Sequence, residues 1–550
     1  MPMLGFSDLS ALRGLDERQR AMLDLRSVYA GTQYERVTIE GEDQPALPWD
    51  MDTGPNNTRI PASHRKPMVM IGVPDDVIDR IVDLAIGEGR FPAVEVEGDP
   101  QGRLREVMLG DDDLELAFHA PDQLVDLMVV GSVALGFSHP VDPDGFSRWE
   151  SLLLETEWCE PVYAGTREQP RSRELAAELE AVDGSGVTSD EDGPIFALPE
   201  GARSDDLVFL RYQWPVKEER STSAAGVGKR DVIVWRRVDY TSTAIIEYRP
   251  VVVEPGASES PGFVPEPVAP HDWGTVPIVW ARSRGGRPGD TEGASVLSPA
   301  LQSLTEAADR SASFWTQAAH VSGSPTLIER DVTDDVKDAL MLADSPKASE
   351  LVAVGPKSVL RYSTAGTSPD VGFLEIGGAG PAALKENTDS LIRLAYETAR
   401  VTRHDPETVK GVISGTALER LNEPSVAQAQ GYRAILGRAW RILAGKLAIA
   451  MQAEGEPVNA EEFSISLRWP RIFRLTAADI QQWAGALSLA IQGGTLSRPT
   501  AIGLLASVLE LEDAEEEAAA IMSERGSIFG NGGGAMPPEE GAEGEEGEEA

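Results

Sequence analysis

The sequence is poor in cysteine and in positive charge. Cys159 is the one cysteine among 550 residues, so the chain cannot form an internal disulfide, and we expect it in a reducing compartment. Lys and Arg number 49 against 90 Asp and Glu, which gives a formal net charge of -41. Because phosphate binding needs clustered Lys and Arg, this balance argues against a generally basic nucleic-acid-binding protein.

Targeting signals and long apolar runs are also missing. The first ten residues lack a positive region followed by an apolar core, so we expect no secretory signal. The longest apolar run, residues 127–137, is too short to span a membrane and contains Gly131 and Ser132. These absences predict a soluble protein with no membrane partner.

No catalytic or metal-binding motif stands out. The six histidines are scattered without an HExxH pair, which argues against a zinc site. Residues 226–229 have the letters of a phosphate loop, but Ser223 replaces its first glycine and Arg230 replaces the Ser or Thr that binds magnesium. We therefore expect no enzyme activity, no cofactor and no bound metal.

The stretch from Leu297 to Gly415 organises the rest of the chain. Ser298 as an N-cap and Pro299 at the first helical position predict the start of a long helix. A second helix opens at Pro381, and its predicted apolar face consists of Leu384, Leu391, Leu394, Ala395 and Ala399. The residues between them, with a helix expected over 333–341 and a strand over 358–362, predict a small folded insertion. The pattern indicates a two-helix stalk that carries a module.

The sequence on either side of this stretch predicts a mixed body. Strands are expected at 93–96, 207–214, 231–240, 244–253 and 463–469, where β-branched and aromatic residues gather. Helices are expected at 12–29, 74–87, 113–130, 425–453, 477–492, 498–510 and 514–524. Residues 166–202 are polar and acidic, and the Gly- and Glu-rich end from Gly530 predicts disorder. The mixture predicts an α+β fold.

Three short motifs occur in a suggestive order. Residues 274–280 read GTVPIVW, residues 414–418 read SGTAL, and residues 491–501 read IQGGTLSRPTA. They resemble, in turn, the G-x-V-P-V-V-x-F strand before the stalk, the S-G-x-A-L step into the long wing helix, and the C-terminal I-x-x-G-x-x-S-x-x-T-A of tailed-bacteriophage portal proteins, the head-to-tail connectors. The resemblance covers about residues 110–510.

The resemblance implies a portal-like α+β fold with a mixed α/β wing, a two-helix stem, a small α/β clip, a long wing helix and a helical crown. It implies an N-terminal arm over residues 1–65, a wing over 66–296, stem helix 1 over 297–321, a clip over 322–380, stem helix 2 over 381–400, a tunnel loop over 401–413, a second part of the wing over 414–475, a crown over 476–528 and a disordered acidic tail over 529–550.

The resemblance also implies a function. Portal proteins form a homo-oligomeric ring, typically a dodecamer, at one capsid vertex, and double-stranded DNA is packaged and ejected through its channel. The implied partners are the major capsid protein, scaffold, large terminase and head-tail connector or adaptor proteins, in the virion and, during assembly, in the host cytoplasm. The acidic composition agrees with a channel that does not adhere to DNA, because tight phosphate contacts slow translocation.

The resemblance assigns two sets of site residues. The DNA-facing cations of the tunnel loop would be Arg400, Arg403, His404 and Lys410. The docking surface of the clip for terminase and connectors would include Glu329, Arg330, Asp334, Asp335 and Lys337. An alternative for Arg400 and Arg403 is that they complement the dipole at the end of the second stalk helix.

Two other classes of protein stay open at this point. A capsid scaffold or adaptor without a channel would share the helices and the acidity but need not close into a ring. An enzyme whose site is assembled from dispersed carboxylates would be stabilised by magnesium or manganese, and its thermal midpoint would rise on addition of the metal.

Overall fold

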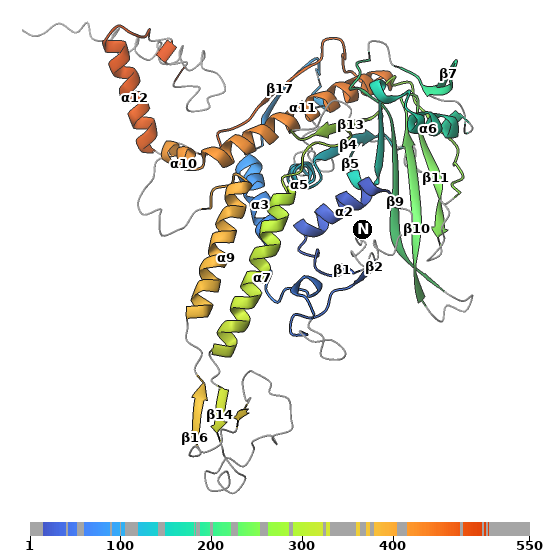
Figure 1. Cartoon of the computed structure of the whole chain (residues 1–550). Coiled ribbons are helices and arrows are strands. Elements are labelled where there is room, and N and C mark those ends of the chain that lie inside the picture. Colours follow the sequence, from blue (N-terminus) through green and yellow to red (C-terminus); the bar gives the residue numbers. More distant parts are fainter. Residues whose placement is uncertain are drawn as a thin grey trace, which may run out of the picture. The chain divides into compact units, whose positions relative to one another are not determined.

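The computed structural model confirms a mixed α+β chain in the part that it describes (Figure 1). It describes residues 15–39, 42–51, 60–87, 91–99, 101–104, 119–140, 149–180, 182, 187–198, 202–221, 229–253, 262–284, 290–322, 326–330, 359–362, 370–374, 379–403, 415–473, 477–497, 500–501 and 504. The chain divides into two compact units, Met1–Asp405 with Asn422–Trp469, and Pro406–Leu421 with Pro470–Ala550.

Most of the described helices match expected ones, but α6 lies in the stretch 166–202, where no helix was expected. They are α2 (Glu17–Tyr29), α3 (Val73–Ile86), α5 (Ala120–Val129), α6 (Pro170–Glu180), α7 (Pro299–Ser322), α9 (Ala379–Thr398), α10 (Gly415–Leu421), α11 (Glu423–Ala453) and α12 (Ala477–Gln492), with single 3-10 turns η2 (Ala62–His64), η4 (Thr156–Trp158) and η5 (Ala164–Thr166). The helices expected at 333–341 and 514–524 lie outside the described residues, as does most of the one expected at 498–510.

The described strands form small sheets. They are β1 (Arg36–Ile39), β2 (Glu42–Pro45), β3 (Ala93–Glu97), β4 (Ser132–Ser138), β5 (Glu150–Leu154), β6 (Cys159–Tyr163), β7 (Val187–Asp190), β8 (Gly193–Phe196), β9 (Leu207–Ser221), β10 (Lys229–Tyr240), β11 (Ala244–Val253), β12 (Ala269–Pro270), β13 (Ile278–Arg282), β14 (Thr326–Arg330), β15 (Val359–Tyr362), β16 (Asp370–Leu374) and β17 (Ser464–Arg468). The largest sheet has the order β12-β11-β10-β9-β6 and is antiparallel throughout. Others are β13-β4-β5 and the pair β17-β3, which joins residues far apart in the sequence.

The five-stranded sheet buries a cluster of charged side chains, Arg211, Arg237 and Asp239. The carboxylate of Asp239 is fully buried and accepts hydrogen bonds from Arg211 Nε at 3.1 Å and from Arg237 Nη2 at 2.5 Å. Tyr248 donates its hydroxyl to the same carboxylate over 3.1 Å. An ionised group can stay buried here because each of these donors satisfies it.

The long helix α11 holds the strand of the GTVPIVW motif. Lys446 is partly buried on α11, and its Nζ donates to the carbonyl oxygens of Val276 at 2.9 Å and Ile278 at 2.8 Å. Burial lowers the pKa of this lysine to about 8. On the same helix Trp440, which is 1% exposed, donates its indole N–H to Gln123 of α5. The second motif therefore leads into a helix whose buried face fixes the first motif.

Gly131 connects α5 to β4 where two segments of backbone meet. Its φ is +92°, and a Cβ there would lie 2.3 Å from the carbonyl oxygen of Gly293. Its own carbonyl accepts the N–H groups of Ser283 and Gly293. Only glycine fits this position, which anchors the segment that leads into α7.

Candidate functional site in the helix pair

The two stalk helices α7 and α9 lie side by side (Figure 1). They are joined through a three-stranded sheet in which β14 pairs parallel with β15 and antiparallel with β16. The strand expected at 358–362 is therefore confirmed. The small module that the sequence predicts between the helices contains this sheet.

Small and hydroxyl-bearing side chains form the seam between α7 and α9. On α7, Ala308 and Ala312 are buried and allow close approach of the helices. Beside them, Ser311 Oγ accepts hydrogen bonds from Asn387 Nδ2 at 3.0 Å and from Thr388 Oγ1 at 2.9 Å. The seam is thus held by directional polar contacts as well as by packing.

The apolar face predicted for α9 is partly wrong. The buried residues are Thr388, Ile392, Ala395, Tyr396 and Ala399. Leu394 is instead 45% exposed, while Leu384 and Leu391 are only partly buried. The physical reason is that α7 presents Ser311 to α9, and Thr388 donates a hydrogen bond to it, which a leucine cannot do.

On its other side, α7 binds a segment of the N-terminal region through a buried carboxylate. Asp309 is 1% exposed, and it accepts the hydroxyl of Tyr34 and the backbone N–H of Ile71, each over 2.8 Å. One turn later, Ser313 Oγ accepts the N–H of Val69 over 3.1 Å. Burial raises the pKa of Asp309, although its two donors act in the opposite direction.

Helix α9 ends in a Schellman turn whose left-handed residue is Arg400, with φ +55°. The N–H of Val401 bonds to the carbonyl of Tyr396 at 3.0 Å, and the N–H of Arg400 bonds to that of Glu397 at 3.1 Å. Val401 and Tyr396 are both buried, as the apolar contact of this motif requires. Glycine is the usual residue at this position, so an exposed arginine here holds strained backbone.

Arg403 lies in a cluster of charged and aromatic groups at the same end of α9. Its guanidinium is 5.7 Å from the centre of the Tyr396 ring, and that of Arg80 is 5.8 Å from it. Tyr396 donates its hydroxyl to Asp76, which also accepts from Arg80 Nε at 2.7 Å. Burial alone would raise the pKa of Asp76, but these hydrogen bonds and the charges of Arg80 and Arg403 lower it.

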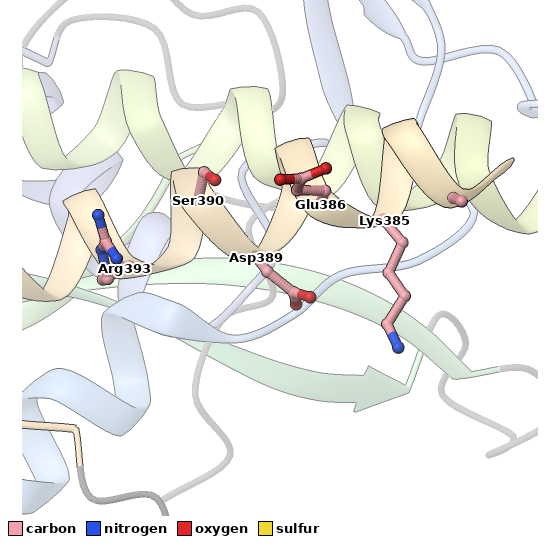
Figure 2. Close-up of a pocket in the computed structure, with 6 residues that line it drawn as sticks. Lys385, Glu386, Asp389, Ser390 and Arg393 are labelled. Carbon is pink, nitrogen blue, oxygen red and sulfur yellow. The ribbon is translucent and has the colours of Figure 1, made fainter. Parts of the chain in front are cut away.

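The remaining face of α9 is charged and open to solvent. Figure 2 shows Lys385, Glu386, Asp389, Ser390 and Arg393 spaced along this one helix, where they line a shallow depression of about 440 Å³. All of them are exposed. Arg393 pairs with Glu397 at 3.4 Å, a surface ion pair that contributes little stability. A face of this kind suits contact with another macromolecule better than retention of a small ligand.

Among the predicted site residues, the structure places only Arg400 and Arg403 with their side chains, and it brings both to the end of α9. Glu329 and Arg330 lie on β14, with their backbone alone described. The other predicted site residues, His404, Lys410, Asp334, Asp335 and Lys337, lie outside the described residues.

Sequence reasoning missed the buried polar stripe of α7. Thr305, Asp309 and Ser313 follow one another at intervals of four residues, and each is at most 2% exposed. This spacing was the available signal, because residues four apart share one face of a helix. In the residues that the structure describes, no group of three or more His, Cys, Asp or Glu side chains is placed to hold a metal ion. No helix of that part is long and apolar enough to cross a membrane.

No protein-family model matches this sequence, and no curated protein matches it. Among solved structures, the chain is similar to a chain of the "Neck of empty GTA particle computed with C6 symmetry", with a TM-score of 0.40 and 11% identity over 79% of this chain and 89% of that one. It is also similar to a chain of the "Neck of native GTA particle computed with C12 symmetry", with a TM-score of 0.34 and 13% identity over 78% and 90% of the two chains.

Proposed function

We propose that this chain is a portal-type subunit that assembles into a ring around a channel for double-stranded DNA. The observation that carries the proposal is the helix pair: α7 and α9 are joined through a three-stranded sheet and are followed by the 31-residue helix α11. This is the order of stem, clip, stem and wing helix that the motif resemblance implies. In this proposal the ring is homo-oligomeric, and a dodecamer is the expected form.

The solvent-facing side of α9 supports assembly between copies. Leu394 is 45% exposed in the single chain, and the charged residues Lys385, Asp389 and Arg393 are exposed on the same helix. Opposite charges at four-residue intervals can pair with a neighbouring helix, while the leucine is removed from water. Head-to-tail contacts of this kind close into a ring when the rotation between copies permits it.

The arginines at the end of α9 are proposed to bind the DNA phosphates only weakly. Arg400 and Arg403 are both exposed, and the guanidinium of Arg403 also lies over the Tyr396 ring near Asp76. A guanidinium that already interacts with a carboxylate has less to gain from a phosphate, which suits transient contacts during translocation. His404 and Lys410 remain predicted members of this set, and Glu329, Arg330, Asp334, Asp335 and Lys337 remain predicted docking residues for terminase and connectors.

The proposed protein has no active site of its own. A separate terminase would supply the energy for packaging, and the capsid protein, scaffold and connectors would be the other partners in the virion. The second candidate function is a capsid scaffold or adaptor without a channel, and the oligomeric state distinguishes it from the first.

Negative-stain electron microscopy with mass photometry tests the proposal on the purified full-length chain. We expect rings with a central hole at a mass near that of a dodecamer. Leu394→Asp should abolish the rings while leaving the thermal midpoint of the monomer unchanged. Ile392→Asp is the control, because Ile392 on the same helix is 7% exposed and a buried charge there should unfold the chain. Particles without a hole, or rings that survive Leu394→Asp, would contradict the channel or the proposed interface respectively.

A further inference from the structure

The exposed face of α11 is positively charged, although the chain as a whole is acidic. Residues 424–453 contain no Asp or Glu, while the full chain has 90 of them. Arg438 and Arg441 are exposed on this helix, and in the described part of the chain neither forms an ion pair. The exposed Arg284 adds a third guanidinium, which lies against Gly431 of α11, where a Cβ would be 2.6 Å from its Cζ.

Large apolar side chains lie on the same face of α11. Ile442 is 42% exposed and Ile449 is 45% exposed. At 3.6 residues per turn, these isoleucines and the two arginines of the helix fall within a sector of about 100°. Between them, a Cβ on Gly445 would meet no neighbouring segment within 4 Å, so the middle of the face is open. Arginines and isoleucines together on an open helix face suit contact with an acidic protein surface.

Helix α3 has an exposed face of the opposite charge. Asp75, Asp79 and Asp83 are exposed at intervals of four residues and therefore lie on one side of the helix. Asp76 pairs with Arg80, whereas none of these three has a cationic partner among the described residues. Like charges at this spacing destabilise a helix, and a cationic partner would remove that cost.

We propose that the exposed face of α11 in one copy of the chain binds the aspartate face of α3 in a neighbouring copy. Arg438 and Arg441 pair with the aspartates, and the isoleucines pack on the half-buried ring of Tyr29, which donates its hydroxyl to Asp79 at 3.1 Å. Two α11 faces would not pair with each other, because their arginines would repel. The contact is therefore heterologous, as a ring requires. The inference rests on the proposed function and adds a second interface to the one at Leu394.

Charge reversal in the full-length chain tests this pairing, with mass photometry as the measurement. Arg438→Glu together with Arg441→Glu should raise the concentration at which rings dissociate by at least about tenfold. Asp79→Lys together with Asp83→Lys should have the same effect. All four substitutions in one chain should restore the rings, because each interface then joins opposite charges again.

Two control variants match the substitutions on α11 in exposure. Arg249→Glu reverses an exposed arginine of β11 and should leave the rings unchanged. Ile442→Ser should weaken the rings, whereas Val252→Ser, at a β11 residue that is 40% exposed, should not. Circular dichroism of each variant establishes that it is folded before assembly is compared.

The possible outcomes separate this inference from the proposed function. Rings that survive the arginine reversal would overturn the inference and leave the proposed function standing. If those rings also lose binding of a double-stranded DNA fragment, the face belongs to DNA. Failure of the fourfold variant to form rings would overturn the pairing of α11 with α3. Particles without a central hole that still depend on the arginines would support the interface and contradict the channel. A parent chain that stays monomeric would overturn both.

Discussion

The two stalk helices carry polar residues at the same spacing but use them in opposite ways. On α7, Thr305, Asp309 and Ser313 are buried, whereas on α9 the equivalent set Lys385, Asp389 and Arg393 is exposed. Each set lies along one helical face. The spacing alone therefore does not say whether such a stripe faces water or a neighbouring segment.

The difference lies in what satisfies the polar atoms. The carboxylate of Asp309 accepts hydrogen bonds from the hydroxyl of Tyr34 and from the backbone N–H of Ile71, both in the N-terminal region that packs on α7. Among the described residues no such segment covers Asp389, which is exposed to water on the open face of α9. Helix α7 is thus fixed to the body through directional contacts, while the open face of α9 is left for contact with other molecules.

The largest expected effect is the difference in stability between two aspartate substitutions, one on each helix. Asp309→Ala leaves the Ile71 N–H and the Tyr34 hydroxyl unpaired in a buried place, and it should lower the free energy of unfolding by about 3 kcal/mol. Asp389→Ala should change it by less than about 0.5 kcal/mol. Urea denaturation of both variants beside the parent chain measures the difference. Equal losses would mean that the buried stripe does not anchor α7.

A smaller change in the free energy of unfolding is expected when pH is varied. Its sign is opposite for Asp309 of α7 and for Asp76, which contacts α9. Burial raises the pKa of Asp309 above the ordinary 3.8, so ionising it costs more in the folded chain, and its contribution to stability falls as pH rises from 3.8 through the raised value. The pKa of Asp76, which contacts Tyr396 of α9, is lowered, so its contribution is complete above 3.8 and is lost as pH falls through the lowered value.

Asparagine variants separate the pH dependence of stability due to Asp309 and to Asp76 from that due to the other carboxylates. The parent chain should lose stability relative to Asp309→Asn as pH rises through the acid range, and relative to Asp76→Asn as pH falls through it. Thermal unfolding across that range, with Asp389→Asn as the control, measures both. Parallel slopes for the two variants would refute the assignment of opposite environments.

Much of the fold was predictable because local signals agreed with the tertiary structure. The start of α7 was fixed by Ser298 and Pro299, and α7 and α11 each begin within two residues of the predicted position. The strands β9 and β11 carry β-branched and aromatic residues that share a core cluster with the leucines of α6. Helix α6 itself lies in the polar, acidic stretch 166–202, where Leu175 and Leu179 supply too few apolar positions to mark it.

The candidate site was harder to predict because its partners come from distant segments. Tyr396 meets Asp76 across 320 positions, and Tyr34 meets Asp309 across 275. No local pattern records such a pairing. The buried face of α9 was mispredicted for a similar reason, since Thr388 is buried and Leu394 exposed, and the partner of Thr388 is Ser311 on another helix. The cations at the end of α9 were found only because the motif resemblance pointed to that turn.

The seam between the helices should contribute about 1 kcal/mol through its central hydroxyl. Ser311→Ala removes the acceptor for Asn387 and Thr388, and Thr388 retains the carbonyl of Leu384 at 2.8 Å as an alternative. A double-mutant cycle with Asn387→Ala should give a coupling energy of about 0.5 kcal/mol. Additive losses would show that the two helices are held by packing alone.

The smallest expected effect is a gain at the end of α9. Arg400→Gly relieves the left-handed backbone and should raise the free energy of unfolding by up to about 1 kcal/mol, less the entropy that glycine returns to the unfolded chain. Arg403→Gly is the control, since among the described residues Arg400 is the one non-glycine with positive φ, and losing the contact with Tyr396 should lower stability. If Arg400→Gly stabilises the chain, the arginine is kept at the expense of stability, which is expected of a residue that contacts a partner such as DNA. A loss of stability would instead show that the guanidinium supports the helix end.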